Sequence, residues 1–388
     1  MTNRIYLDHA ATTPMDQRVF DAMAPFTMGM YGNASSMHTD GTRVHEAMDN
    51  ARDQLAGALG ASASEICFTS GGTEANNWAL KGIAFANRHR GNHIIVSSIE
   101  HDSVLNVCQW LMKQGFRITF LPVDGEGMVD PLSIEKWISP ETILISVMHA
   151  NNEIGTIQPI GDIARLAHEK GIYFHTDACQ SFGKVPINVS KQPIDLLTVN
   201  AHKIYGPKGV GALYIRKGVV IEPILHGGGQ EMGMRSTTEN IPGIIGFAKA
   251  AELCLEEMEP ERARLNDMRN RLVRLLEEGI EGVYFNGGQE HCLPGYLNFS
   301  ISGMEGESIR LALLLDEAGI SVSTGSACSS NHNGNPSSHV LQAIGRNPFE
   351  ARGAIRVTMG RFTKTEEIGI FYEKISEINQ SLTSIFHR

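Results

Sequence analysis

Cys328 lies in the middle of a polar stretch that reads SVSTGSACSSNHNGNPSSHV over residues 321–340. Buried cysteines usually lie among aliphatic side chains and are inert, whereas a reactive thiol must be accessible and able to form its thiolate. The Ser, Gly and Asn residues around Cys328 therefore predict an accessible thiol with a chemical role.

A second candidate is the motif GGTEANN at residues 71–77, which follows a predicted strand and opens a predicted helix. Backbone N–H groups at Gly72 and Thr73 would then lie at the positive end of the helix dipole, which is a typical anion site. The alternative is a tight glycine turn in which Thr73 caps the helix. The motif has neither the GxGxxG of dinucleotide-binding folds nor the GK[ST] of a P-loop, so any bound phosphate belongs to another kind of ligand.

A carboxylate and a lysine follow two later strands. HTDACQ places Asp177 and Gln180 at the end of one strand, and NAHKIYGPKG places Lys203 after the next strand, before a glycine and proline turn. A lysine that forms a Schiff base must be held and partly desolvated, which such a turn provides. The alternative is a solvated surface lysine.

An anion site, a carboxylate and a held lysine are together the groups that bind pyridoxal phosphate. The helix start would take the phosphate, Asp177 would keep the pyridine nitrogen protonated, and Lys203 would bond the aldehyde. His101, in SSIEHDS after another strand, could stack on the ring and move protons near neutral pH. The alternative for His101 is a hydrogen-bonded histidine at a strand end.

The composition is that of an ordinary globular protein, with 388 residues, 42% hydrophobic and 20% charged, which is enough for a large domain and a smaller one. A net charge of −10 without a Lys/Arg cluster argues against a nucleic-acid or anionic-membrane surface. The N-terminus, MTNRIYLDHAATTP, has no apolar targeting segment, and no stretch approaches the roughly 18 apolar residues of a membrane span. We therefore expect a cytoplasmic protein that acts on small molecules.

The six cysteines form no CxxC pair, so the sequence predicts reduced thiols and neither a disulfide framework nor a zinc site. Cys328, His332 and His339 could form a local ligand group, but their spacing fits no familiar zinc pattern. We expect no resident metal.

The elements that must position these residues alternate between strand and helix from residue 62 to about residue 216, which is typical of a mostly parallel sheet covered by helices on both faces. Ligands bind at the carboxyl ends of such strands. A long helical region around residues 240–279 precedes a second α+β region. We predict a large domain over residues 15–258, and a smaller one that combines residues 1–14 with 259–388 and carries Cys328.

The ordered set of motifs resembles one family, the cysteine desulfurases of the NifS/IscS type, which belong to the aspartate-aminotransferase-like fold type I of pyridoxal phosphate enzymes. The resemblance covers essentially the whole chain. It rests on the segments YLDHAATTP, YGNASSMH, FTSGGTEANN, EHDSV, NNEIGTIQPI, HTDACQSFGK, AHKIYGPKGVGALYI, GGGQE, TENIPGI, TGSAC and IRVTMGR.

The resemblance implies a role for each site residue. Lys203 would bond the cofactor aldehyde, and Asp177 would pair with the ring nitrogen. Gln180 would bond the ring hydroxyl, and His101 would be the stacked base. The expected phosphate contacts are Gly72, Thr73, His202, Asn200 (where relatives usually carry Ser or Thr) and Thr238, which would reach the phosphate of the neighbouring subunit in a homodimer. The residues expected to bind the substrate carboxylate are Arg356, Asn152 and Asn33. Asn152 would also contact the cofactor.

The implied reaction converts L-cysteine to L-alanine and leaves the sulfur on Cys328 as a persulfide. That sulfur would then pass to an iron–sulfur scaffold or another acceptor protein, for cluster assembly or tRNA thiolation, and a loop suits such delivery. It stays open whether Cys328 also ligates a cluster held by a partner. Two other readings remain: an aminotransferase or selenocysteine lyase on the same fold, and a catalytically silent binding platform.

Overall fold

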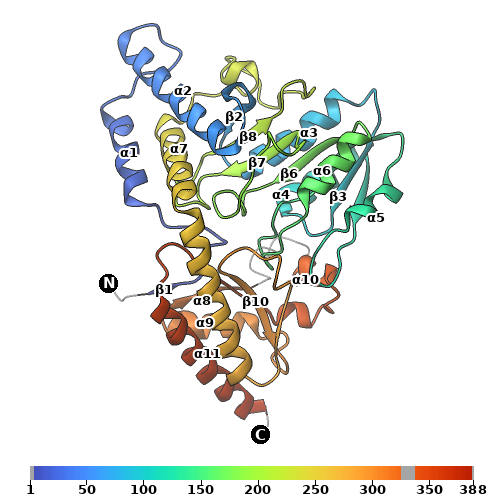
Figure 1. Cartoon of the computed structure of the whole chain (residues 1–388), viewed down its shortest axis with the longest axis vertical. Helices are drawn as coiled ribbons and strands as arrows, with labels where there is room; N and C mark the ends of the chain where they lie inside the picture. Colours follow the sequence, from blue (N-terminus) through green and yellow to red (C-terminus); the bar gives the residue numbers. More distant parts are fainter. Residues whose placement is uncertain (1–3, 325–336, 387–388) are drawn as a thin grey trace.

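The computed structural model describes residues 4–324 and 337–386, and its largest element is a seven-stranded mixed sheet (Figure 1). The strands lie in the order β2-β8-β7-β6-β5-β3-β4. Strands β4, β3, β5, β6 and β7 are parallel, whereas β8 runs antiparallel to both β7 and β2. The bounds are β2 Ile66–Thr69, β3 His93–Ser97, β4 Arg117–Leu121, β5 Thr142–Ser146, β6 Tyr173–Asp177, β7 Leu196–Asn200 and β8 Gly211–Ile215.

Helices cover both faces of this sheet, as the apolar strand sequences require. In β3, Ile95 packs in one hydrophobic cluster, while Ile94 and Val96 pack in another on the opposite face. The first face is covered by α2 (Thr39–Leu59), α6 (Ile160–Glu169) and α7 (Ile241–Glu256), against which α1 (Gln17–Met28) also packs. The second face is covered by α3 (Gly72–Ala86) and α4 (Asp102–Lys113), and the short α5 (Pro131–Ile134) packs near α6. The predicted α/β fold class is confirmed.

A second sheet with its own hydrophobic core lies below the first in Figure 1. It is antiparallel, in the order β12-β13-β10-β9, and β1 pairs separately with β11 in parallel. The strands are β1 Ile5–Tyr6, β9 Val283–Phe285, β10 Tyr296–Ile301, β11 Ile320–Ser321, β12 Ser323–Thr324 and β13 Ile355–Thr358. The helices are α8 Met258–Gly279, α9 Ser308–Glu317, α10 His339–Ala343 and α11 Thr365–Phe386.

The N-terminal arm joins this second region because β1 pairs with β11 and Asp8 bridges to Thr358. Helix α7 ends at Glu256 and α8 begins at Met258, so the chain passes from the first sheet to the second near this point. The domain boundaries at residues 14/15 and 258/259 stay a prediction. In the described parts of the chain, we find no helix with the length and apolar character needed to cross a membrane.

Candidate active site

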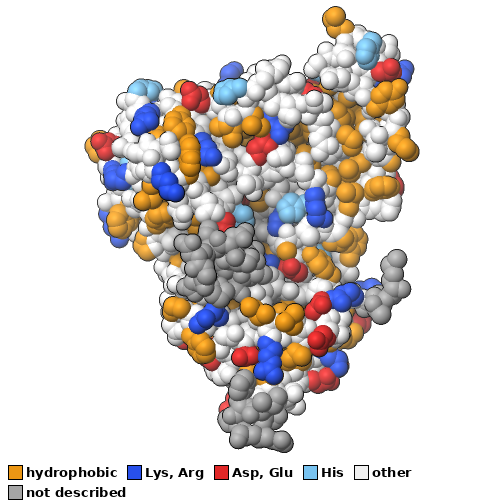
Figure 2. Space-filling view, turned by 180° about the vertical axis from the view of Figure 1, so that it is seen from behind, with side chains coloured by type: hydrophobic (Ala, Val, Ile, Leu, Met, Phe, Trp, Pro, Cys, Tyr) orange, Lys and Arg blue, Asp and Glu red, His pale blue; other side chains and the backbone are white. Residues whose placement is uncertain are grey.

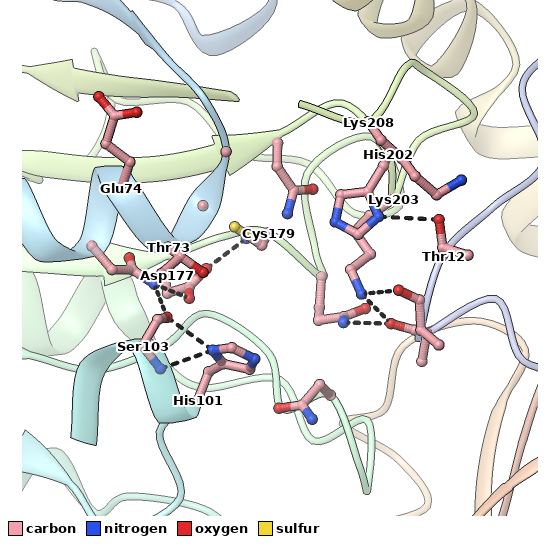
Figure 3. Close-up of a pocket in the computed structure, with 18 of the residues that line it drawn as sticks. Thr12, Thr73, Glu74, His101, Ser103, Asp177, Cys179, His202, Lys203 and Lys208 are labelled. Atoms are coloured by element: carbon pink, nitrogen blue, oxygen red, sulfur yellow. Dashed lines mark hydrogen bonds between the residues drawn. The ribbon is translucent and has the colours of Figure 1, made fainter. Parts of the chain in front are cut away.

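A cavity of about 580 Å³ lies at the carboxyl ends of the large sheet's parallel strands, where the N-terminal arm and β13 reach it. Figure 3 shows Asp177, Ser103 and His101 on one side of this cavity and His202, Lys203 and Thr12 on the other. Most residues predicted from the sequence line it: Gly72, Thr73, His101, Asn152, Asp177, Gln180, Asn200, His202, Lys203 and Arg356.

The start of α3 lies at one end of the cavity, where its backbone N–H groups suit an anion. Its N-cap is Gly71, which has φ 153° and, within the described residues, no side-chain cap. The expected alternative, in which Thr73 caps the helix, is therefore wrong. Gly72 must be glycine because a Cβ there would lie 2.6 Å from the Sγ of Cys179. Asn200 also lines the cavity, and its buried Oδ1 has no hydrogen-bond partner among the described residues. This oxygen could accept a hydrogen bond from a bound ligand.

Asp177 is only 5% exposed and lies at the end of β6. Its Oδ1 accepts the backbone N–H of Cys179 at 2.9 Å, and its Oδ2 accepts Nδ2 of Asn76 at 2.6 Å. The same Asn76 Nδ2 donates to Ser103 Oγ at 2.8 Å. These bonds hold the carboxylate in one orientation at the cavity wall.

His101 is the N-cap of α4, and its exposed ring faces the cavity (Figure 3). Nδ1 accepts the backbone N–H of Ser103 at 3.1 Å and lies 2.8 Å from Ser103 Oγ. Because Nδ1 is an acceptor, the neutral ring carries its proton on Nε2. A ring N–H is thus presented on the same side of the cavity as Asp177.

Lys203 approaches from the opposite side, and its Nζ contacts the carbonyl oxygens of Ala10 and, at 2.7 Å, Ala11. His202 Nδ1 lies 3.1 Å from Thr12 Oγ1. Burial, together with the positive charges of Lys203 and other lysines, lowers the pKa of His202 to about 4. His202 is therefore neutral near pH 7 and can serve as a hydrogen-bond donor.

Arg356 lies on β13, is 3% exposed, and reaches the cavity from the second sheet. It donates to the backbone carbonyl of Asn152 at 2.9 Å and to Asp8 Oδ1 at 2.8 Å. Its buried Nε has no hydrogen-bond partner among the described residues. A buried guanidinium beside an amide side chain is suited to a small carboxylate ligand.

Three predicted residues are not brought into this cavity. Thr238 lines an adjoining cavity, which shares Ser70 and Gly209 with the first. Asn33 is exposed in the connection between α1 and α2. Cys328 lies outside the described residues. The roles of all three stay predictions.

Residues 337–339, which follow the Cys328 stretch in the sequence, lie beside the site. Ser338, the N-cap of α10, donates its Oγ–H to Glu153 Oε2 at 2.6 Å, and His339 Nε2 lies 3.0 Å from the carbonyl oxygen of Glu100. Burial raises the pKa of the Glu153 carboxyl. Glu153 follows Asn152 in the sequence, and Glu100 precedes His101. Ser338 and His339 are therefore each bonded to a direct neighbour of a site residue.

Residues 5–371 match the family described as aminotransferase class-V. The chain belongs to this family. A cysteine desulfurase IscS of Dictyoglomus turgidum is 50% identical over 99% of this chain and 97% of its own. Among solved structures, a NifS-like protein has a TM-score of 0.91 at 40% identity and covers 97% of this chain and 99% of its own. The structure titled "SspA in complex with cysteine" has a TM-score of 0.82 at 37% identity, over 93% and 100% of the two chains.

These relatives confirm the resemblance to cysteine desulfurases and the fold type I expectation. The family uses pyridoxal phosphate, as expected. The site fits that cofactor, because a helix start without a side-chain cap from the described residues lies across one cavity from a fixed carboxylate and a lysine. When bound, pyridoxal phosphate supplies a reactive aldehyde and a ring that withdraws electrons from the substrate.

Several residues of this site were not predicted from the sequence. Asn76 lies inside the GGTEANN motif, one helical turn after Gly72, and that spacing could have indicated that it returns to the strand ends. Ser103 follows His101 by two residues in the quoted EHDSV segment. The contacts of the Ala10 and Ala11 carbonyl oxygens could not be predicted from the sequence, because every residue has a backbone carbonyl.

Proposed function

We propose that this protein converts L-cysteine to L-alanine and takes up the sulfur on Cys328 as a persulfide. The observation that carries the proposal is the convergence of Lys203, Asp177 and the start of α3 on one cavity, which Arg356 enters from the second sheet. The relative solved in complex with cysteine supports the choice of substrate. Sulfur for iron–sulfur clusters or thiolated tRNA is the use we propose.

The cofactor would be held from several sides by this chain's own residues. Gly72, Thr73 and neutral His202 offer donors to the phosphate, with Asn200 beside them. Asp177 offers a carboxylate to the ring nitrogen, and Gln180 offers an amide donor to the ring hydroxyl. Lys203 offers the amine for the aldehyde.

The substrate carboxylate would bind between Arg356 and Asn152. Asp8 now accepts a hydrogen bond from Arg356, so a bound carboxylate would compete with Asp8 or use the unpartnered Nε. His101 would move protons through its Nε2, which faces the cavity. Asn33 would also bind the substrate carboxylate. It lies outside the cavity of its own chain, so we propose that it serves the site of the neighbouring subunit.

Sulfur transfer would proceed by attack of the Cys328 thiolate on the substrate sulfur. A sulfur–sulfur bond forms and the carbon–sulfur bond breaks, and its electron pair goes to the substrate carbon, which takes a proton. The products are alanine and a Cys328 persulfide, so atoms and electrons balance without an external oxidant. An acceptor protein, such as an iron–sulfur scaffold, would then take the terminal sulfur.

We propose that the enzyme works as a homodimer in which Thr238 serves the neighbouring site. Large apolar side chains are exposed on α1 and the segment after it, including Phe20 (54%), Met28 (84%) and Tyr31 (79%). Figure 2 shows hydrophobic side chains gathered over this part of the molecule, at the upper right. Exposed apolar patches of this kind mark interaction surfaces. A cytoplasmic location is also proposed, since the five described cysteines are all free thiols.

The test is alanine formation from L-cysteine by the wild-type holoprotein and by Cys328→Ala. We expect the wild type to form alanine and the variant to lose this activity while it keeps bound cofactor. Undiminished alanine formation by Cys328→Ala would overturn the persulfide step and favour an aminotransferase or selenocysteine lyase. A protein that gains no visible absorbance with pyridoxal phosphate would favour a silent platform.

A further inference from the structure

Behind the cavity wall, three polar side chains form a chain of hydrogen bonds that joins the two sheets. Lys184 Nζ donates to Tyr296 Oη at 3.0 Å, and Tyr296 Oη donates to Gln180 Oε1 at 2.6 Å. Gln180 Nε2 then donates to the backbone carbonyl of Ala10 at 3.0 Å. Tyr296 begins β10 of the second sheet, whereas Lys184 and Gln180 follow β6 of the first.

The ammonium group sets the direction of the first two bonds, and the Ala10 carbonyl, which can only accept, sets the direction of the third. An ammonium has only donors, so the Tyr296 oxygen must accept from Lys184. The Tyr296 proton then goes to the other neighbour, which must present an acceptor. Gln180 therefore turns Oε1 toward Tyr296, and its Nε2 donor lies on the side of Ala10 and the cavity.

The surroundings hold this arrangement in place. Tyr296 is 1% exposed, and its own carbonyl accepts Nε of Arg269 at 2.8 Å. Lys184 also donates to the backbone carbonyl of Gln180 at 2.9 Å, which fixes the ammonium on the same turn. Burial lowers the pKa of Lys184 to about 8, so the amine still carries its proton near pH 7. Neither Lys184 nor Tyr296 lines the cavity, so both act through Gln180.

We propose that Lys184 and Tyr296 are positioning residues that fix the amide orientation of Gln180, so that the cofactor ring hydroxyl meets a donor and not an acceptor. This rests on the proposed function, in which Gln180 bonds that hydroxyl. A hydrogen-bond donor stabilises the negatively charged form of the ring oxygen. The bound pyridoxal phosphate then takes up a proton less readily, so its pKa is lower. Without the relay the amide keeps only its bond to the Ala10 carbonyl and is held less firmly, so the ring hydroxyl loses its fixed donor and the pKa of the bound cofactor rises.

The experiment is a spectroscopic pH titration of the holoprotein without substrate, for the wild type, Tyr296→Phe and Lys184→Met. We expect each variant to raise the midpoint pH of the change in visible absorbance by about one pH unit. This is the size that one hydrogen bond to a charged group sets. The double variant should move it no further, because both changes break one chain. Gln180→Leu should give the same upward shift.

The matched control is Tyr284→Phe, which removes a hydroxyl on the neighbouring strand β9 of the same sheet. We expect it to leave the midpoint unchanged. A midpoint unchanged in both Tyr296→Phe and Lys184→Met, with a shift in Gln180→Leu, would overturn the relay. Wild-type protein without any visible band would instead overturn the proposed function itself.

Discussion

Asn76 donates a hydrogen bond of 2.6 Å to Asp177, so a helix side chain fixes the carboxylate at the end of β6. The other bond of the Asn76 amide, to Ser103, continues through Ser103 to His101. One buried asparagine thus links the expected partner of the ring nitrogen to the expected base. Asp177 and His101 are thus tied to one another through two shared partners, Asn76 and Ser103.

Asn76→Ala should lower alanine formation about 10- to 100-fold, because a hydrogen bond to a charged group is worth about 1.5–3 kcal/mol. Bound cofactor should remain. The matched control is Asn77→Ala, since the Asn77 amide, among the residues that the structure describes, donates to the backbone of Thr73 on the exposed side of the helix. Equal losses in the two variants would contradict a specific role for Asn76.

Asp177→Ala should keep pyridoxal phosphate bound but lose turnover by about 100-fold or more, because a ring without its proton is a weak electron sink. Cofactor content from visible absorbance and the rate of alanine formation are measured on the same sample. Turnover that stays at the wild-type level would remove Asp177 from its assigned role.

Ser338→Ala should slow sulfur uptake by Cys328 about fivefold, the equivalent of one hydrogen bond of about 1 kcal/mol. The reason is that Ser338 ties the root of the Cys328 segment to Glu153. Persulfide formation is followed by rapid quenching and mass spectrometry. Ser337→Ala is the control, since Ser337 accepts a hydrogen bond from Gln342 of α10 and, within the described residues, makes none to Glu153. The idea fails if Ser337→Ala is as slow as Ser338→Ala.

Glu100 gives a pH dependence of stability. It is fully buried, accepts hydrogen bonds from Ser97 and the backbone of Met148, and its pKa is raised by burial to about 8. In the unfolded chain a glutamate has a pKa near 4.3, so between about pH 4.3 and pH 8 the folded state holds the extra proton. Stability from this group is therefore greatest at low pH and falls as the pH rises through that window.

Glu100→Gln keeps the shape of the neutral acid and removes this loss. The melting temperature of the variant, relative to wild type, should rise by a few degrees between pH 5 and pH 8. The exposed Glu366→Gln serves as the control and should show no such change. A difference that stays constant across this range would show that Glu100 ionises normally.

The sequence predicted the part of the site that follows strands. Lys203, Asp177 and His101 could be placed because a strand pattern followed by a chemically distinctive residue puts that residue at the sheet's carboxyl edge. The capping of α3 was predicted less well. One interpretation of the sequence placed Thr73 at the N-cap of this helix, whereas Gly71, with its positive φ, is the N-cap in the structure.

Contacts between distant segments could not be predicted. Tyr296 reads as an ordinary strand residue, and only the packing of the second sheet against the first brings it to Gln180. The same holds for Ser338 and Glu153, and for Ala10, which contributes only its backbone. Such pairs depend on how two sheets meet, and local patterns in the chain do not specify that.

The central claim is that sulfur leaves L-cysteine and stays on one thiol of the enzyme. The direct measurement is incubation of the holoprotein with sulfur-34-labelled L-cysteine, followed by peptide mass spectrometry and quantification of alanine. We predict a heavy persulfide on the peptide that contains Cys328, in proportion to the alanine formed in the first turnover. Alanine formed without heavy sulfur on Cys328, or heavy sulfur on another cysteine alone, would contradict the account.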